Sequence, residues 1–281
     1  MNRKIKISRR QMITASVAGG VGLVCAYPFF IERYLVMENH YRIPVPNLPS
    51  AFEGFRIVQI ADLHYGFLVP MSVVRRVVRR ANKIPADLIV CTGDYIHEKN
   101  STAQIDEVWP ELDKLESPSG VMSILGNHDH WGDTDRSQYW LEKTGQNMRF
   151  QVKALEKNGQ RLWFAGAGDY WEDHQPLDLL LKQVPADECR IVLAHNPDSA
   201  DTAYDRHFDL MICGHTHGGQ VKIPFLGAPV LPVENKNYSE GFLKTTRGMP
   251  LFISRGIGWA ILPVRFNCFP EIAVLELVAQ A

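Results

Sequence analysis

The chain has few cysteines, and its charges are balanced and spread along its length. Its 281 residues include 5 cysteines with no Cys-x-x-Cys spacing, a pattern that predicts neither a zinc cluster nor a disulfide framework. The formal net charge is −1, and no basic patch predicts a nucleic-acid partner. Internal repeats and low-complexity tracts are also absent. We therefore expect one large domain with a substantial core, and buried reduced thiols at Cys25, Cys91, Cys189, Cys213 and Cys268.

The N-terminus carries the one long stretch without charge. Residues 1–10 contain basic side chains and no acidic one, and no charged residue lies between Gln11 and Ile31. A basic flank followed by an apolar segment of membrane length is typical of an export signal or a membrane anchor. The segment Ser8–Ile13, SRRQMI in one-letter code, resembles a twin-arginine export signal. Because positive flanks stay in the cytoplasm, we expect a helix in a bacterial cytoplasmic membrane and the rest of the chain outside the cytoplasm.

Alternatives for this N-terminal segment stay open. No small-x-small cleavage site precedes Glu32, which favours an uncleaved anchor over a signal that is removed. A third alternative is an apolar helix that packs on the domain.

The rest of the chain alternates between short apolar runs and amphipathic segments. Runs rich in Val, Ile and Leu predict buried strands at Phe55–Ile60, Leu88–Cys91, Val121–Leu125, Ile191–Ala194 and Leu210–Cys213. Helical periodicity predicts helices at Met71–Lys83, Gln104–Leu115 and Asp133–Thr144. Extended segments punctuated by Gly and Pro predict an antiparallel second sheet from Gln220–Ile223, Gly241–Thr246, Leu251–Ser254 and Glu271–Leu277. The expected fold class is α/β, a two-sheet α/β sandwich flanked by helices, with an N-terminal membrane helix.

A polar block rich in Asp, Asn and His follows each of the five predicted strands. The blocks are Asp62-Leu63-His64, Gly93-Asp94, Gly126-Asn127-His128-Asp129, His195 and Gly214-His215-Thr216-His217. Ligand crevices of α/β sheets lie at the carboxyl ends of the strands, so we expect these side chains to converge. Imidazoles and carboxylates suit Mn, Fe, Zn or Co. Two such divalent ions held by two carboxylates keep a net positive charge, which binds phosphate and lowers the pKa of bound water.

The order of these blocks resembles the calcineurin-like metallophosphoesterase superfamily, and the resemblance covers nearly all of residues 55–277. The sequences at 195–198, 214–220 and 254–256 most resemble the bacterial YaeI/YkuE-type phosphodiesterase branch. We therefore expect a metallophosphoesterase catalytic domain at residues 40–281, behind an N-terminal export signal or membrane anchor at residues 1–39. The resemblance also implies roles for nine residues: Asp62, His64 and His217 hold one metal ion; Asn127, His195 and His215 hold the other; Asp94 bridges them; His128 faces the phosphate; and Asp129 orients His128.

The function that this resemblance implies is metal-dependent hydrolysis of a phosphate ester, with a diester favoured, by in-line attack of a metal-bridging hydroxide. One alternative is a hydrolase like the UDP-2,3-diacylglucosamine pyrophosphatases of the lipid A pathway, which needs its active site in the cytoplasm. An alternative of another class is a non-catalytic, membrane-associated scaffold.

Several other residues near the motifs have open roles. A lipid-linked substrate is attractive if an apolar wall lies beside the phosphate, although core packing is the commoner fate of such side chains. The candidates for that wall are Trp131, Phe225, Leu226 and Trp259. His130 either touches substrate or caps a helix. The remaining histidines lack metal-ligand spacing, and we expect structural roles for His40, His97, His174 and His207.

Overall fold

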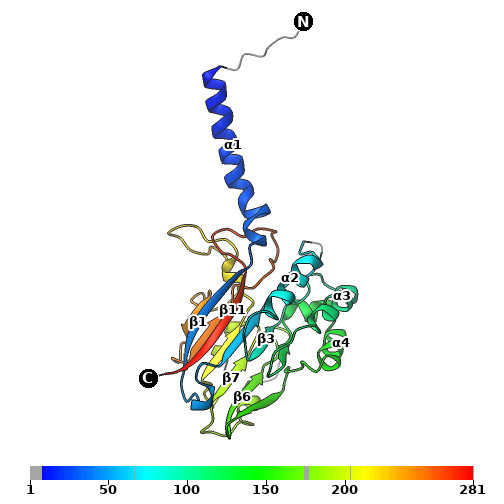
Figure 1. Ribbon diagram of the computed structural model, residues 1–281, viewed down its shortest axis with the longest axis vertical. Helices are drawn as coiled ribbons and strands as arrows, with labels where there is room; N and C mark the ends of the chain where they lie inside the picture. The colour runs from blue at the N-terminus through cyan, green and yellow to red at the C-terminus, as the bar shows by residue number, and fades with distance from the viewer. Residues whose placement is uncertain (1–7, 67, 174–176, 203, 281) are drawn as a thin grey trace.

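Two β-sheets pack face to face in the computed structural model, which describes residues 8–66, 68–173, 177–202 and 204–280 (Figure 1). The first sheet has the strand order β1 (Met37–Val45), β11 (Glu271–Ala279), β2 (Arg56–Ile60), β3 (Leu88–Thr92), β4 (Val121–Ile124). The second has the order β5 (Val152–Lys157), β6 (Gln160–Gly166), β7 (Arg190–Leu193), β8 (Leu210–Cys213), β10 (Pro250–Ile253), β9 (Gly241–Lys244). The expected two-sheet α/β sandwich is therefore confirmed.

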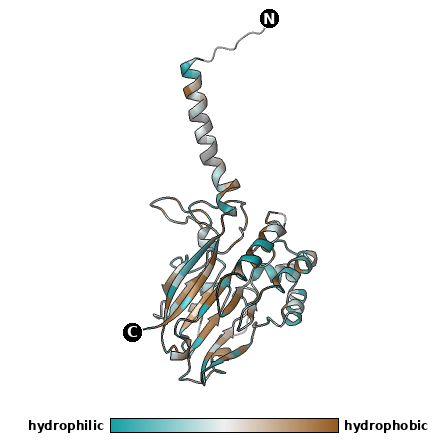
Figure 2. Cartoon of the chain, in the orientation of Figure 1, coloured by the Kyte–Doolittle hydropathy of each residue, from teal (hydrophilic) through white to brown (hydrophobic). Residues whose placement is uncertain are grey.

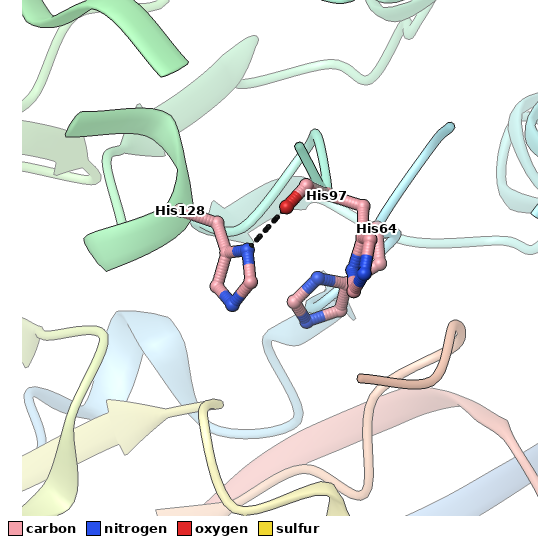
Figure 3. A group of neighbouring side chains, drawn as sticks. All are labelled: His64, His97 and His128. Carbon is pink, nitrogen blue, oxygen red and sulfur yellow. Dashed lines mark hydrogen bonds between the residues drawn. The ribbon is translucent and has the colours of Figure 1, made fainter. Parts of the chain in front are cut away.

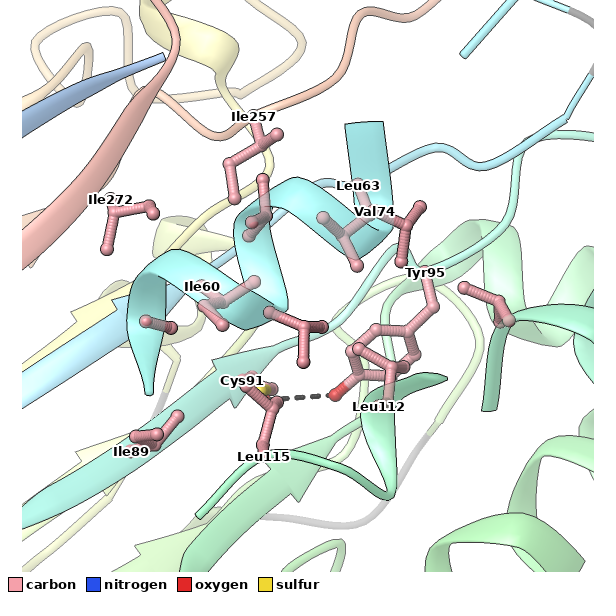
Figure 4. Close-up of a cluster of buried hydrophobic side chains, with 14 of the residues drawn as sticks. Ile60, Leu63, Val74, Ile89, Cys91, Tyr95, Leu112, Leu115, Ile257 and Ile272 are labelled. Atoms are coloured by element: carbon pink, nitrogen blue, oxygen red, sulfur yellow. Dashed lines mark hydrogen bonds between the residues drawn. The ribbon is translucent and has the colours of Figure 1, made fainter. Parts of the chain in front are cut away.

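Helices cover the outer face of the first sheet. They are α2 (Met71–Ala81), α3 (Thr102–Leu112) and α4 (Asn127–Lys143). Helix α2 buries its valine stripe and exposes most of its arginines, as its 3.6-residue periodicity predicts. Figure 4 shows part of this core, where the Tyr95 hydroxyl donates to the Cys91 carbonyl oxygen. The strands carry most of the apolar residues, and the helices carry many hydrophilic ones (Figure 2).

Two further clusters of apolar side chains complete the layers. One fills the space between the sheets, with Ile57 and Val90 of the first sheet beside Phe164 and Ile212 of the second. The other lies on the outer face of the second sheet, beneath the short helix α5 (Leu177–Leu181). Because both faces of both sheets are covered, strands such as β3 and β8 are buried along their whole length.

The pairing of the strands differs from the expectation in two respects. Strands β2, β3 and β4 lie in the first sheet, whereas β7 and β8 lie in the second. The second sheet is also mixed rather than antiparallel, since β10 pairs with β8 in parallel, and β11 joins the first sheet beside β2. Residues 220–223 form isolated bridges instead of a strand. A strand buried on both faces has the same apolar pattern in either sheet, so the pattern does not name its partner.

Helix α1 (Arg9–Phe30) precedes the domain and projects from it (Figure 1). Ser8 caps it, and the reciprocal hydrogen bonds of Ser8 and Gln11 form a capping box. Among the residues that the structure describes, none of the helices is long and apolar enough to cross a membrane, so the expected membrane helix is not supported. Residues 1–7, with most of the basic flank, and the side chain of Cys25 lie outside the described part of the chain.

The chain enters the domain immediately after α1. The 3-10 helix η1 (Glu32–Tyr34) buries Glu32, which accepts a hydrogen bond from the backbone N–H of Cys268 at 2.7 Å. The boundary expected between residues 39 and 40 stays a prediction, and β1 begins at Met37. The thiols of Cys91, Cys189, Cys213 and Cys268 are free and buried, and burial raises the pKa of Cys91 to about 12.

Candidate metal centre

The five polar blocks meet at one edge of the sandwich. Each follows the carboxyl end of a strand, namely β2, β3, β4, β7 and β8, and Asn127 opens helix α4. The backbone amide of Asp62 donates to the carbonyl of Gly93, and that of His64 donates to the carbonyl of Asp94, each at 3.0 Å. These bonds join the loops after β2 and β3, so the convergence expected from the sequence is present.

The backbone of these loops is strained where the candidate ligands sit. A positive φ between 48° and 71° occurs at Asp62, His64, Asp94, His215 and His217. A side chain other than glycine in this left-handed region costs on the order of 1–3 kcal/mol and persists only where the surrounding structure holds it. The strained backbone therefore lowers the stability of the fold but directs these side chains toward the candidate metal centre.

The first candidate group of metal ligands is Asp62, His64 and His217, all of which are buried. The Nε2 atoms of the two histidines lie 2.9 Å apart, and His217 Nε2 lies 3.8 Å from Asp62 Oδ1. The second carboxylate oxygen, Asp62 Oδ2, is buried with no hydrogen-bond partner among the described residues. Converging donor atoms and a buried unpaired oxygen fit a divalent cation.

The second candidate group contains His195, His215 and Asn127. His195 Nε2 lies 3.0 Å from His215 Nδ1 and 3.2 Å from Asn127 Oδ1. The other ring nitrogens point at carbonyls, since His195 Nδ1 donates to Thr92 O at 2.7 Å and His215 Nε2 donates to Pro232 O at 2.8 Å. When both rings are neutral, these bonds place the lone pairs on His195 Nε2 and His215 Nδ1, the nitrogens that face each other, as is usual for histidines that bind metals.

Asp94 joins the two groups. Its Oδ2 lies 3.4 Å from His64 Nε2 and 3.3 Å from His195 Nε2. Its Oδ1 accepts the backbone N–H of His128 at 2.8 Å. A carboxylate between two sets of imidazoles is the arrangement that a pair of metal ions requires. All seven candidate metal ligands predicted from the sequence are thus brought together.

Burial decides the charge of most of these groups. It lowers the pKa of His64 and His217 well below the usual value and that of His215 to about 3, so these imidazoles are neutral. Burial also raises the pKa of Asp62 to about 7. Burial acts against ionisation of Asp94 too, but the surrounding imidazoles, His195 foremost, hold its pKa well below the usual value.

We expect metal binding to release a proton from His195. Burial disfavours its charged form, but the Asp94 charge foremost, with those of Asp62 and Asp169, raises its pKa to about 10 in the metal-free protein. A divalent ion binds only the neutral imidazole. Between pH 8 and 10, Mn²⁺ affinity should therefore rise about tenfold per pH unit and level off above the pKa of His195.

Calorimetry of Mn²⁺ binding at pH 8, in buffers of different ionisation enthalpy, should count about one proton released per protein. The variant His40→Gln, changed at an exposed histidine, should release the same number, and a count near zero would contradict the charged state of His195.

His128 and His97 lie beside the first group, and Figure 3 shows them with His64. The ring of His128 lies 4.6 Å from that of His64, at right angles to it, and its Nδ1 donates to the His97 carbonyl at 2.7 Å. The ring of His97 stacks on His128 at 5.4 Å. The bond to this carbonyl uses Nδ1 of His128 and leaves Nε2 as the nitrogen that does not bond to the backbone. The expectation that His97 is only structural missed a residue of the site, and its position three residues after Asp94 was the available signal.

Asp129 does not orient His128, which corrects the sequence-based expectation. Its buried carboxylate accepts three backbone N–H groups, those of Asp94 at 2.8 Å, Tyr95 at 2.9 Å and Gly126 at 2.9 Å. Asp129 therefore ties the loop after β3 to the loop after β4. The side chain of residue i+1 on a helix turn points away from that of residue i, so neighbours in sequence do not pair here.

The remaining candidates divide between core and site. His130 is structural, since its Nε2 lies 3.3 Å from Asp173 Oδ2 and its Nδ1 contacts the Thr134 hydroxyl. Trp259 is buried in the core, whereas Phe225 and Leu226 are exposed. Trp131 contacts His128, with ring centroids 4.7 Å apart. His40 and His207 are exposed, and His174 lies outside the described residues.

Comparison with known proteins agrees with this geometry. The model of the calcineurin-like phosphoesterase family matches residues 55–219. The metallophosphoesterase YkuE of Bacillus subtilis is 32% identical, over 97% of this chain and 98% of its own. The phosphodiesterase YaeI of Escherichia coli is 35% identical, over 80% and 82%. The UDP-2,3-diacylglucosamine pyrophosphatase LpxG of Chlamydia trachomatis is 25% identical, over 83% and 88%. The chain therefore belongs to the calcineurin-like phosphoesterases, in the YaeI/YkuE branch, and is a metal-dependent phosphoric ester hydrolase.

Proposed function

We propose that this protein is a phosphodiesterase that uses two divalent metal ions. The observation that carries the proposal is the position of Asp94 Oδ2, within 3.4 Å of His64 Nε2 and 3.3 Å of His195 Nε2, between two groups of buried ligands. The first ion is assigned to Asp62, His64 and His217, the second to Asn127, His195 and His215, and Asp94 is shared. Such a pair supplies positive charge for the phosphate oxygens and makes water acidic enough to react near neutral pH.

His128 acts on the phosphate group or on the oxygen of the leaving group. Because its Nδ1 donates to the carbonyl of His97, Nε2 can donate a proton only when the ring is protonated. In that form His128 binds a phosphate oxygen or delivers the Nε2 proton to the leaving oxygen. Asp129 contributes indirectly, since it holds the loops that carry Asp94 and Asn127 at their relative positions.

The side chains around His128 and His215 support a diester substrate over a monoester. Two indoles, Trp131 and Trp171, contact His128 and His215. A diester carries one negative charge and two organic groups, so it offers more apolar surface to these indoles than a dianionic monoester does. YaeI, a relative at 35% identity, is named a phosphodiesterase.

The function is tested with the full-length protein and added Mn²⁺, on bis(p-nitrophenyl) phosphate and p-nitrophenyl phosphate. We expect a higher kcat/KM for the diester. Faster hydrolysis of the monoester, with both metal sites loaded, would overturn the phosphodiesterase assignment.

The similarity to LpxG supports a second candidate function, so UDP-2,3-diacylglucosamine should be tested as a substrate in the same assay. If the protein hydrolyses UDP-2,3-diacylglucosamine but neither nitrophenyl ester, this result would favour a pyrophosphatase with a lipid-linked substrate. The scaffold alternative loses its basis, because no candidate ligand is missing.

We further propose that the protein is anchored at a bacterial cytoplasmic membrane with its catalytic domain outside the cytoplasm. The twin-arginine pattern at Arg9 and Arg10 supports export. Exposed apolar side chains at the base of α1 and on two loops support contact with lipid. They are Phe29, Phe30, Ile31, Phe225, Leu226, Ile261 and Leu262. The backbone of Arg265 donates to Pro28 O at 3.2 Å, which places the second of these loops beside α1 (Figure 1).

Export is tested with Arg9→Lys plus Arg10→Lys in the full chain fused to a reporter that is active only outside the cytoplasm. The double variant should lose reporter activity. Arg42→Lys plus Arg56→Lys, changed on exposed arginines of the domain, should keep it. Unchanged export of the first variant would exclude the twin-arginine route.

A further inference from the structure

Two tryptophans from distant parts of the chain form a wall across the metal centre. Trp131 lies in the first turns of α4, and Trp171 lies in the loop after β6. The ring centroids of Trp131 and His128 lie 4.7 Å apart, and those of Trp171 and His215 lie 4.6 Å apart in an edge-to-face contact at 82°. Between themselves the two indoles are nearly parallel, at 14°, with centroids 6.4 Å apart. The wall therefore runs from the imidazole assigned to the phosphate to a candidate ligand of the second ion.

Hydrogen bonds hold the wall in place. Trp131 Nε1 donates to Glu172 Oε1 at 2.6 Å, so the residue next to Trp171 fixes the first indole. The backbone N–H groups of Trp171 and Glu172 donate to Asp169 Oδ1 at 2.9 and 3.0 Å, and Asp169 is buried. A binding surface held in this way loses little conformational entropy when a ligand arrives.

The exposure of the second indole is unusual for this chain. Trp109 and Trp259 are buried in the core, whereas Trp171 is 40% exposed beside a metal ligand. Packing in the core therefore does not explain Trp171, and its exposed ring beside the metal centre is available to a ligand. The ammonium of Lys99 lies 4.3 Å from the centroid of Trp131 and adds positive charge at this mouth.

We propose that Trp131 and Trp171 form a subsite for a planar aromatic substituent of the phosphate ester, an aryl group or a nucleobase. The inference rests on the proposed function, because it places the phosphate at the metal centre. Since Lys99 lies over the Trp131 ring, the exposed ring of Trp171 offers the π-face on which a ring stacks, and Trp131 lies nearly parallel beside it. The alternative occupant, an alkyl or acyl chain, gains from apolar area but not from the orientation of the rings.

The subsite is tested by calorimetric titration of the Mn²⁺-loaded full-length protein with three ligands: methyl phosphate, phenyl phosphate and octyl phosphate. Phenyl phosphate should bind about 10- to 100-fold more tightly than methyl phosphate, the range expected for one stacked ring. Trp171→Ala should remove most of this preference and weaken the binding of methyl phosphate much less than that of phenyl phosphate. Trp171→Phe should restore much of the preference. Tyr139→Ala, changed at an exposed ring of α4, should leave it intact.

Two outcomes would overturn the subsite. Equal weakening of methyl and phenyl phosphate by Trp171→Ala would show that the indole only supports the metal centre. A gain for octyl phosphate that depends equally on Trp171 would assign the wall to an alkyl chain instead of a ring. The three ligands are monoesters, the products of the proposed diester hydrolysis, and the readout is binding. Failure of the subsite therefore stays distinct from failure of the phosphodiesterase proposal, which the nitrophenyl esters test separately.

Discussion

Replacing Asp94→Asn should abolish metal-dependent hydrolysis while the fold stays intact. One oxygen of Asp94 lies within 3.4 Å of an imidazole nitrogen in each group, and the charge of this carboxylate persists despite burial. An amide of the same shape removes the charge that holds the two ions together. Because metal ions supply several kcal/mol of transition-state stabilisation, kcat/KM for bis(p-nitrophenyl) phosphate should fall on the order of 10³-fold or more.

Metal content and thermal stability give independent readouts of the same variant. Elemental analysis should show less than two ions per chain, and Mn²⁺ should raise the Tm of the wild type much more than that of the variant. Asp209→Asn is the matched control. Asp209 is equally buried and accepts the backbone N–H of Arg190, but it lies at the opposite end of β8. This control should lose stability and keep its metal, and full turnover by Asp94→Asn would refute the bridging role.

The variant Gly126→Ala should disrupt the centre by sterics alone. A methyl group on Gly126 would lie 2.4 Å from Asp94 Oδ1 and 2.7 Å from the ring of His195. The φ of Gly126 is −111°, which alanine adopts freely, so any loss comes from the clash and not from the backbone. Asp94 or His195 must move, and a misplacement of about 1 Å in an active site can cost roughly 100-fold in rate.

Gly22→Ala is the control for this change, because a methyl group there meets no atom within 4 Å. Hydrolysis of bis(p-nitrophenyl) phosphate and metal content should both drop in Gly126→Ala and stay at the wild-type level in Gly22→Ala. Normal metal content and normal kcat/KM in Gly126→Ala would mean that the loop after β4 relaxes, and that the site is less rigid than its geometry indicates.

Most of the secondary structure was readable from local patterns. The valine stripe of α2 and the apolar runs of β2, β3 and β8 gave the right elements, because burial of one helix face or of both strand faces leaves a direct periodic trace. Strands β1, β5 and β6 were not predicted, since β1 and β5 lie at sheet edges and are partly exposed along their length. These patterns also did not indicate which of the two sheets each strand joins.

The candidate metal ligands that the sequence indicates meet in space. They could be chosen because metal chemistry restricts ligands to a few residue types and the motifs occur in a recognisable order. The positioning residues were harder. Asp129 lies next to His128 in the chain but bonds to the loops of Asp94 and Gly126. His97 contacts His128 through its carbonyl, a group that every residue has, and through the stacking of its ring.

Residue type and order in the chain therefore defined the chemistry of this protein. Two carboxylates, an amide and four imidazoles follow the carboxyl ends of buried strands. Those features are local, so they survive in a one-dimensional description. The sheet that each strand joins, the φ strain at the ligands and the approach of Trp171 to His215 became visible only in three dimensions. They depend on contacts between residues far apart in the chain, and neither periodicity nor spacing encodes such contacts.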